Sequence, residues 1–318
     1  MITKEHISNM AHIVDELDKN DSFRYKNTEK DNILVEMGIN VNYETHEVEF
    51  TDAHENGVDT SLEHNPVVDT ATIPGITVYS IFQRNDAIQQ DGNPLIYALK
   101  GSNEHGWNIS DENRTKLTER IQAIVGMFCE KHPVDFTIVV PSGGGVNSML
   151  RDILSEVLSG QDKENIILNN TLEKMTVDEV EEEMFEKDSP FSQEFDTPEK
   201  KQRAWEKIKD SFARMRSENN GVFSYKMVRP PRYREWITKT LKFSDRTDIA
   251  EMASKLPGKN ILIIDDTITF GNTIRSAANL IRDTISNIKY DIDTVGQFAP
   301  ASISALTLLS VKQHVPRR

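Results

Sequence analysis

The sequence is poor in cysteine and in long apolar runs, and each shortage excludes a class of protein. Cys129 is the single cysteine among 318 residues, so an internal disulfide is impossible and a structural zinc site is not expected. No apolar run approaches the roughly 20 residues that a membrane-spanning helix needs. The first residues also lack the basic-then-apolar pattern of a signal peptide. We therefore expect a cytoplasmic protein without a membrane partner, in which Cys129 is a small core residue.

The sequence also contains fewer basic than acidic residues. The 37 Lys and Arg against 51 Asp and Glu leave a net charge of -14. A protein that coats nucleic acid needs surplus cations to neutralise phosphates, so nucleic acid is not an expected partner. A small anionic ligand is still compatible, because it needs only a local cradle of backbone N–H groups and a few cations. The eight histidines form no pair with zinc-ligand spacing, and no Walker A lysine motif or internal repeat is present.

The first hundred residues have the pattern of a mixed α+β region. Apolar residues at helical spacing predict a helix over 5–18. Alternating apolar residues predict a hairpin over 39–50, and the polar stretch 51–70 is expected to be a long loop. A second hairpin is expected with the arms Ile76–Arg84 and Pro94–Lys100, joined by a glycine-containing turn.

From residue 110 onward the pattern changes to alternating strands and helices. Ser110 is an N-cap for a helix whose buried stripe ends at Phe128. Phe136–Val140 is a continuous apolar run, typical of a strand buried on both faces, and a glycine-rich turn and a helix follow it. This is the opening of an α/β unit. Further strands are expected at 165–169, 222–228, 261–264 and 304–311, and a further helix at 247–256.

Residues 175–221 have the pattern of a helical insertion. Thr176 can cap a very acidic helix, and Thr197, followed by proline, starts another. The apolar face of that second helix either packs onto the main body or meets a partner. We divide the chain into an N-terminal α+β region, 1–105, and a core, 106–318, that carries the insertion. The fold class is α/β, with an open, mostly parallel sheet flanked by helices.

The segment Ile261–Thr273 has the strongest chemical signature. A buried strand delivers Asp265 and Asp266 to its C-terminal edge, where ligands of open α/β sheets bind. A turn rich in Thr and Gly and the start of a helix follow, which together bind anions, and Gly271 lets the backbone approach a phosphate closely. Two acids beside such a cradle suit a sugar phosphate, because they accept hydrogen bonds from vicinal hydroxyls. An ordinary strand-to-helix junction is the alternative, but it does not explain the continuation Thr-Phe-Gly-Asn-Thr.

These thirteen residues resemble the signature that type I phosphoribosyltransferases use to bind 5-phosphoribosyl-1-pyrophosphate (PRPP). That signature has four apolar residues, two acids, a short variable stretch and Thr/Gly-rich residues. The resemblance implies that Asp265 and Asp266 face the ribose hydroxyls, act in catalysis and orient a Mg²⁺ ion as its protein ligands. The substrate-binding loop that it implies consists of Thr267, Ile268, Thr269, Phe270, Gly271, Asn272 and Thr273.

Two further loops extend the resemblance. In the family an upstream strand ends in a loop that binds pyrophosphate, and here that place is taken by Ser142, Gly143, Gly144 and Gly145. This loop lacks the Lys or Arg of some members, and a simple tight turn is the alternative interpretation. The place of a loop that closes over the pyrophosphate is taken by the segment between the strands expected at 165–169 and 222–228, which is far longer than the usual loop and contains the insertion. Its candidate cations are Lys174 at its start and Lys226, Arg229, Arg232 and Arg234 at its end. Of these, we assign Lys174 and Arg229 to catalysis, and a solvated basic loop is the alternative for the arginines.

The resemblance covers about residues 130–318 and implies a glycosyltransferase of the pentosyltransferase type, active in nucleotide metabolism. Such an enzyme transfers phosphoribose from PRPP to a small-molecule acceptor and releases pyrophosphate. Members that use 6-oxopurines carry an acid where this chain has Thr269, which argues against hypoxanthine or guanine as acceptor. The unmatched region 1–105 would be the hood that binds the acceptor.

The long insertion and the unmatched N-terminal region mark an atypical member, so two other functions stay open. One is a regulator that senses PRPP or a nucleotide on the same fold. The other is a relative that cleaves PRPP or a ribosyl-phosphate bond with water. The insertion itself is compatible with a lid, a homodimer contact or a partner site.

Overall fold

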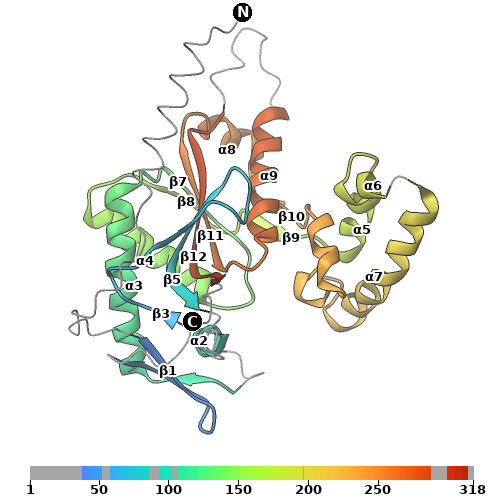
Figure 1. The fold of residues 1–318 in the computed structure, drawn as a ribbon. Coiled ribbons are helices and arrows are strands. Elements are labelled where there is room, and N and C mark those ends of the chain that lie inside the picture. Colours follow the sequence, from blue (N-terminus) through green and yellow to red (C-terminus); the bar gives the residue numbers. More distant parts are fainter. Residues whose placement is uncertain are drawn as a thin grey trace, which may run out of the picture. The chain divides into compact units, whose positions relative to one another are not determined.

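The computed structural model describes residues 38–51, 58–85, 93–101, 106–195, 197–287 and 299–313. These residues form a mixed α/β fold, in which a ten-stranded and largely parallel sheet is flanked by helices (Figure 1). The helix predicted over 5–18 lies outside the described residues. Within the described ranges, no helix is both long enough and apolar enough to cross a membrane.

The parallel part of the sheet consists of five neighbouring strands in the order β5-β12-β11-β7-β8. The strands predicted around residues 136, 165, 261 and 304 all lie in this part and are confirmed. The bounds of the five strands are β5 (Thr77–Asn85), β12 (Ser302–Gln313), β11 (Asn260–Thr267), β7 (Phe136–Val139) and β8 (Ile166–Leu168).

The remaining strands extend the same sheet beyond β5. The predicted hairpin over 39–50 is confirmed, with Ile39 opposite Phe50. The long loop expected over 51–70 is wrong in part, because β3 and β4 pair antiparallel with β5 there. The bounds are β1 (Gly38–Asn42), β2 (Glu47–Thr51), β3 (Val58–Asp59), β4 (Val67–Asp69) and β6 (Asn108–Ile109).

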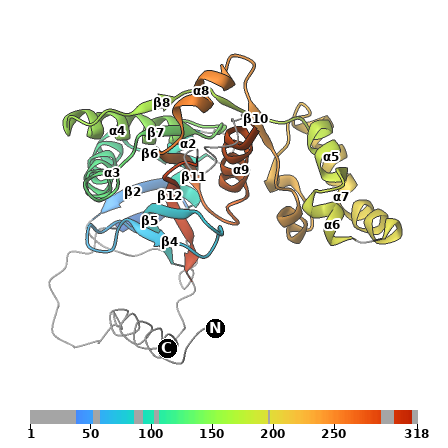
Figure 2. The same ribbon diagram turned by 90° about the horizontal axis from the view of Figure 1, so that it is seen from above.

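Helices cover both faces of the sheet (Figure 2). Side chains of β11 alternate between the two faces, because successive residues of a strand point in opposite directions. Leu262 and Ile264 pack in the core with α3 and α4, whereas Ile261 and Ile263 pack in the core with α8 and α9. The helices are α3 (Asp111–Lys131), α4 (Val146–Gly160), α8 (Ile249–Lys255) and α9 (Asn272–Asn287).

The helix α2 (Asn93–Lys100) replaces the second arm of the hairpin predicted over residues 76–100, so that prediction is wrong. The run Leu-Ile-Tyr-Ala-Leu is compatible with either element by pattern alone, because continuous apolar residues occur in buried strands and in buried helices. In the structure Leu95, Ile96 and Leu99 are buried together against the α3–α4 side of the sheet. Their spacing of one and four residues is that of a helix face, and Pro94 stands in the first turn, where proline is tolerated.

The insertion extends beyond the predicted 175–221 and covers residues 175–240, between β9 and β10. It is a helical unit with its own apolar cluster, which includes Ile208, Phe212 and Met215 of α7. The apolar face of α7 therefore packs inside the insertion. The caps predicted at Thr176 and Thr197 are confirmed, since each side chain accepts a hydrogen bond from a backbone N–H of its helix. The helices are α5 (Val177–Phe185), α6 (Pro190–Glu194) and α7 (Pro198–Glu218), followed by the 3-10 helices η1 (Tyr225–Met227) and η2 (Pro231–Trp236).

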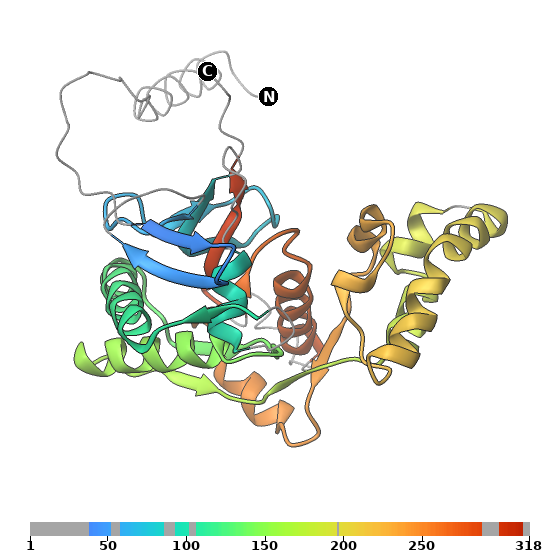
Figure 3. The same cartoon turned by 90° about the horizontal axis from the view of Figure 1, so that it is seen from below.

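A two-stranded ribbon, β9 (Leu172–Lys174) and β10 (Leu241–Phe243), leads into and out of the insertion (Figure 3). The strand predicted over 222–228 is wrong, because β10 rather than this segment pairs with β9. Only Val222 forms an isolated bridge, to Thr176, and η1 follows it.

Candidate functional site

The candidate site lies where the connections of the parallel sheet change direction. From β7 the chain passes through α4 to β8, which is the neighbour of β7 on the side away from β11. From β11 the chain continues through α9 toward β12, which is the neighbour of β11 on the side away from β7. β7 and β11 are neighbours, with Val139 opposite Ile264. Their carboxyl ends therefore diverge at a topological switch point, the place where open α/β sheets bind ligands.

The two loops singled out in the sequence meet at this point. The backbone N–H of Val140 donates to the carbonyl of Ile264 at 3.0 Å, which brings the ends of β7 and β11 together. Just beyond, the Ser142 hydroxyl donates to Oδ2 of Asp266 at 3.2 Å. The glycine-rich turn after β7 thus lies beside the paired acids of β11, although more than 100 residues separate them.

Both loops open into a cavity of about 500 Å³. Its other walls come from α2, from the β9–β10 ribbon and from the insertion, through Tyr97, Lys226 and Arg234 among others. The predicted site residues that line it are Ser142, Gly143, Lys174, Asp265, Asp266, Thr267, Thr269, Phe270, Gly271, Asn272 and Thr273. A smaller cavity of about 250 Å³ lies in the insertion around Trp236 and contains none of these residues.

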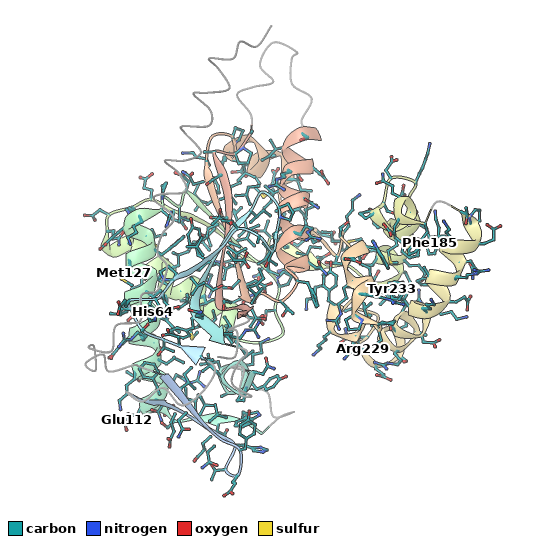
Figure 4. The ribbon with its side chains drawn as sticks, in the orientation of Figure 1. His64, Glu112, Met127, Phe185, Arg229 and Tyr233 are labelled. Atoms are coloured by element: carbon teal, nitrogen blue, oxygen red, sulfur yellow. The ribbon has the colours of Figure 1, made fainter. Side chains whose placement is uncertain are left out.

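The remaining predicted residues lie outside the cavity lining. Ile268 is buried beneath the loop, and Gly144 and Gly145 continue the turn after Gly143. Arg229 is exposed on the insertion (Figure 4). Its backbone N–H donates to the Ser211 hydroxyl oxygen.

Asp265 is the more buried of the two acids, with 8% of its surface exposed. Its Oδ1 accepts the backbone N–H of Asp266 at 2.9 Å. Burial, together with the neighbouring carboxylate of Asp266, raises the pKa of Asp265 to about 7. The protonated form of Asp265 is therefore favoured over a much wider pH range than for an ordinary carboxyl, and in that form it can donate as well as accept a hydrogen bond.

Asp266 faces the cavity and has several partners. Its Oδ2 pairs with the ammonium of Lys100 and accepts from Ser142, while its Oδ1 accepts from the Thr267 hydroxyl at 3.1 Å. The ion pair is partly shielded from water, since the side chains of Lys100 and Asp266 are 23% and 15% exposed. Asp266 is thus the accessible carboxylate of the pair.

Cations surround the acids, in contrast to the net negative charge of the chain. Lys100, Lys174, Lys226 and Arg234 all line the cavity. Partial burial lowers the pKa of Lys174, and the two aspartates act in the opposite direction. The ammonium groups of Lys100 and Lys226 lower that pKa further, so at least three cationic groups interact electrostatically there. Such a concentration of positive charge favours an anionic ligand.

The turn between β11 and α9 is shaped to approach an anion. Gly271 has φ +66°, and a methyl group in its place would overlap the side chain of Ile73. Helix α9 begins at Asn272, so its first backbone N–H groups have no partner within the helix, and they point toward the turn. Phe270 is 52% exposed in this turn, with the guanidinium of Arg234 5.9 Å from its ring centre.

Sequence reasoning missed Lys100 and Tyr97, because it read their helix as a strand. Lys100 brings to the glycine-rich turn the cation that the turn itself lacks, since its side chain packs directly on Gly144. Pro94 in the first turn and the basic Lys100 in the last turn are the sequence signals of a helix that could have placed them.

The acids fit a magnesium ion that is shared with a bound ligand. Mg²⁺ takes oxygen ligands, keeps several waters, and is usually held by one or two carboxylates together with substrate phosphates. Asp266 offers one accessible carboxylate, with Asp265 behind it. Across the described ranges, no group of three or more His, Cys, Asp or Glu side chains could hold a metal, so a cage made of protein ligands alone does not fit.

Comparison of the sequence with models of known protein families yields no match, and neither does comparison with curated proteins.

Proposed function

We propose that the chain binds PRPP and transfers its 5-phosphoribosyl group to a small-molecule acceptor, with release of pyrophosphate. One arrangement carries the proposal: paired acids, an anion-binding helix start and a glycine-rich turn line a single cavity at the switch point of the sheet. PRPP presents a group for each of these parts: two vicinal hydroxyls for the acids, a 5'-phosphate for the helix start and a diphosphate for the glycine-rich turn. The cations of the cavity complement its negative charge.

Each part of the site has a separate role in this proposal. Thr269, Thr273 and the first N–H groups of α9 hold the 5'-phosphate. Asp265 and Asp266 orient the ribose through its hydroxyls. The turn Ser142–Gly145 and the ammonium of Lys174 bind the diphosphate.

The reaction breaks the bond between ribose C1 and the diphosphate oxygen. The electron pair of that bond leaves with pyrophosphate, a lone pair of the acceptor forms the new bond to C1, and the acceptor loses its proton to solvent. Because the transition state separates a cationic ribose ring from an anionic leaving group, the protein acts by positioning and by charge stabilisation. A Mg²⁺ ion held at Asp266 would supply further positive charge for the leaving pyrophosphate.

Thr269 restricts the class of acceptor that the site is proposed to use. It lines the cavity where phosphoribosyltransferases for 6-oxopurines have an acid that assists at the base. We therefore propose an acceptor other than hypoxanthine or guanine.

Calorimetric titration with PRPP in the presence of Mg²⁺ tests binding, and pyrophosphate release over a panel of nucleobases tests transfer. Asp266→Asn should weaken PRPP binding by about tenfold or more, which corresponds to at least ~1.4 kcal/mol. Asp152→Asn, at an exposed pair with Arg151, is the matched control and should bind as the wild type does. Failure of the wild type to bind PRPP would refute the proposal.

Binding without turnover on any base would instead identify a PRPP sensor. Pyrophosphate release without any acceptor would identify cleavage of PRPP by water.

A further inference from the structure

Lys100 stands at the centre of the candidate site although it comes from α2, far from both loops in sequence. Its ammonium pairs with Oδ2 of Asp266, and its stem lies across the glycine-rich turn. A methyl group added to Gly144 would lie 2.9 Å from Cβ of Lys100 and would overlap its Cγ. Glycine at position 144 is therefore required by the passage of this side chain.

The ammonium of Lys100 occupies the place that a divalent cation needs. Mg²⁺ binds a carboxylate oxygen directly at about 2.0–2.1 Å, and an ammonium hydrogen-bonded to the same oxygen repels it. The other oxygen, Oδ1, is engaged by the Thr267 hydroxyl. Asp265 offers little compensation, because its carboxyl is buried and accepts the backbone N–H of Asp266.

The same lysine is also placed to meet the diphosphate of a bound ligand. Its four-carbon stem already rests on the turn that we assign to this group, so rotation of the terminal bonds can redirect the ammonium. A diphosphate carries more negative charge than one carboxylate, and an ammonium shared by the two moves toward the stronger anion. Lys174 and Lys226 in the cavity wall add to the attraction of the anion.

Resting on the function proposed above, we propose that Lys100 is a built-in counter-cation. It keeps divalent metal off Asp266 in the free protein and turns to the diphosphate when the ligand binds. Metal binding thereby becomes dependent on the anionic ligand, and the free site does not accumulate metal.

The test uses Mn²⁺ as a spectroscopic probe of the metal and inorganic pyrophosphate as a probe of the anion. Lys100→Met removes the charge but keeps a stem that can pack on Gly144. Free Mn²⁺, followed by electron paramagnetic resonance, should bind this variant about tenfold more tightly than it binds the wild type. Metal-free pyrophosphate, followed by calorimetry, should bind the variant about tenfold more weakly.

Lys255→Met is the matched control, because Lys255 forms an exposed pair with Glu251 on α8. It should behave as the wild type in both titrations. Lys100→Gln is a second neutral variant, for use if the methionine variant does not fold. An unchanged affinity for Mn²⁺ or for pyrophosphate in the folded neutral variant would overturn the inference.

The experiments distinguish failure of the role of Lys100 from failure of the proposed function. If the wild type binds Mn²⁺ with pyrophosphate but does not bind PRPP, the phosphoribosyl proposal fails while the role of Lys100 stands. If the wild type binds PRPP and the Lys100 variants show no change in Mn²⁺ or pyrophosphate affinity, the role of Lys100 fails alone.

Discussion

Arg84 on β5 forms a hydrogen bond to the loop after β11, in which its Nη2 donates to the carbonyl oxygen of Ile268 at 2.9 Å. Its Nε donates to the carbonyl of Ser310 on β12, and 95% of the arginine's surface is buried. One side chain of the N-terminal region therefore joins β12 to the loop that lines the candidate site. The shape of that loop depends on a residue 184 positions earlier in the chain.

Replacement of Arg84 by Met should destabilise the protein and weaken ligand binding together. Loss of the donor leaves the carbonyl of Ile268 without this bond in a buried place, which costs about 1–3 kcal/mol. Urea denaturation should show a lower free energy of unfolding, and ribose 5-phosphate should bind several-fold more weakly. Arg151→Met, at an exposed pair with Asp152, should change neither quantity. Equal behaviour of the two variants would show that Arg84 does not support the loop.

Gly271→Ala should distort the turn between β11 and α9 directly. The positive φ of Gly271 disfavours any other residue, and the new methyl group would overlap the side chain of Ile73. We expect a loss of about 1–3 kcal/mol in stability and a loss of phosphate binding, measured by thermal unfolding and calorimetry.

The matched control for this variant is Gly126→Ala in the middle of α3, where an added methyl group meets no atom within 4 Å. It should stabilise the helix by about 0.5–1 kcal/mol. Tight binding of ribose 5-phosphate by Gly271→Ala would contradict the proposed placement of the 5'-phosphate.

The buried Asp265 should make the stability of the protein fall as pH rises between about 4 and 7. Its pKa in the folded state is raised to about 7 from an ordinary value of 3.8. In that interval the folded state holds more protons than the unfolded state, so a rise in pH favours unfolding. Its stabilising contribution is therefore complete below pH 4 and is lost as pH passes through 7.

Asp265→Asn should flatten this part of the profile, as measured by urea denaturation at a series of pH values. Above pH 7 the variant should be more stable than the wild type by at least about 1 kcal/mol, since one pKa unit corresponds to ~1.4 kcal/mol. Asp152→Asn, at an exposed carboxylate, should leave the profile as it is. A profile of Asp265→Asn that parallels the wild type would show that Asp265 is not the group responsible.

Cys129 should be unreactive toward thiol reagents in the folded protein. It is fully buried, and burial raises the pKa of its thiol to about 11, so the reactive thiolate is scarce at neutral pH. Labelling with a chromogenic disulfide should occur at the rate of unfolding and should become fast in denaturant. Rapid labelling of the native protein would mean that α3 opens locally far more often than its packing indicates.

Much of the local structure could be predicted from the sequence, because it depends on neighbouring residues. Ser110, Thr176 and Thr197 cap their helices through bonds to backbone groups three residues away. Misreadings occurred where short segments were ambiguous. The apolar run 95–99 fits a strand or a helix by pattern alone. The segment 222–228 contains one isolated bridge and a 3-10 helix, because β10 takes its place as the partner of β9.

Three parts of the candidate site follow from consecutive residues: two acids at the end of a buried strand, a Thr/Gly-rich turn before a helix, and a glycine-rich turn after another strand. Their chemistry can therefore be inferred along the chain. Which distant groups surround them depends on the fold. The contact of Lys100 with Asp266, the bond from Arg84 to Ile268 and the raised pKa of Asp265 arise from burial and from contacts between distant segments. Charge, desolvation and packing act through space, between residues whose separation in sequence does not reveal their distance in the fold.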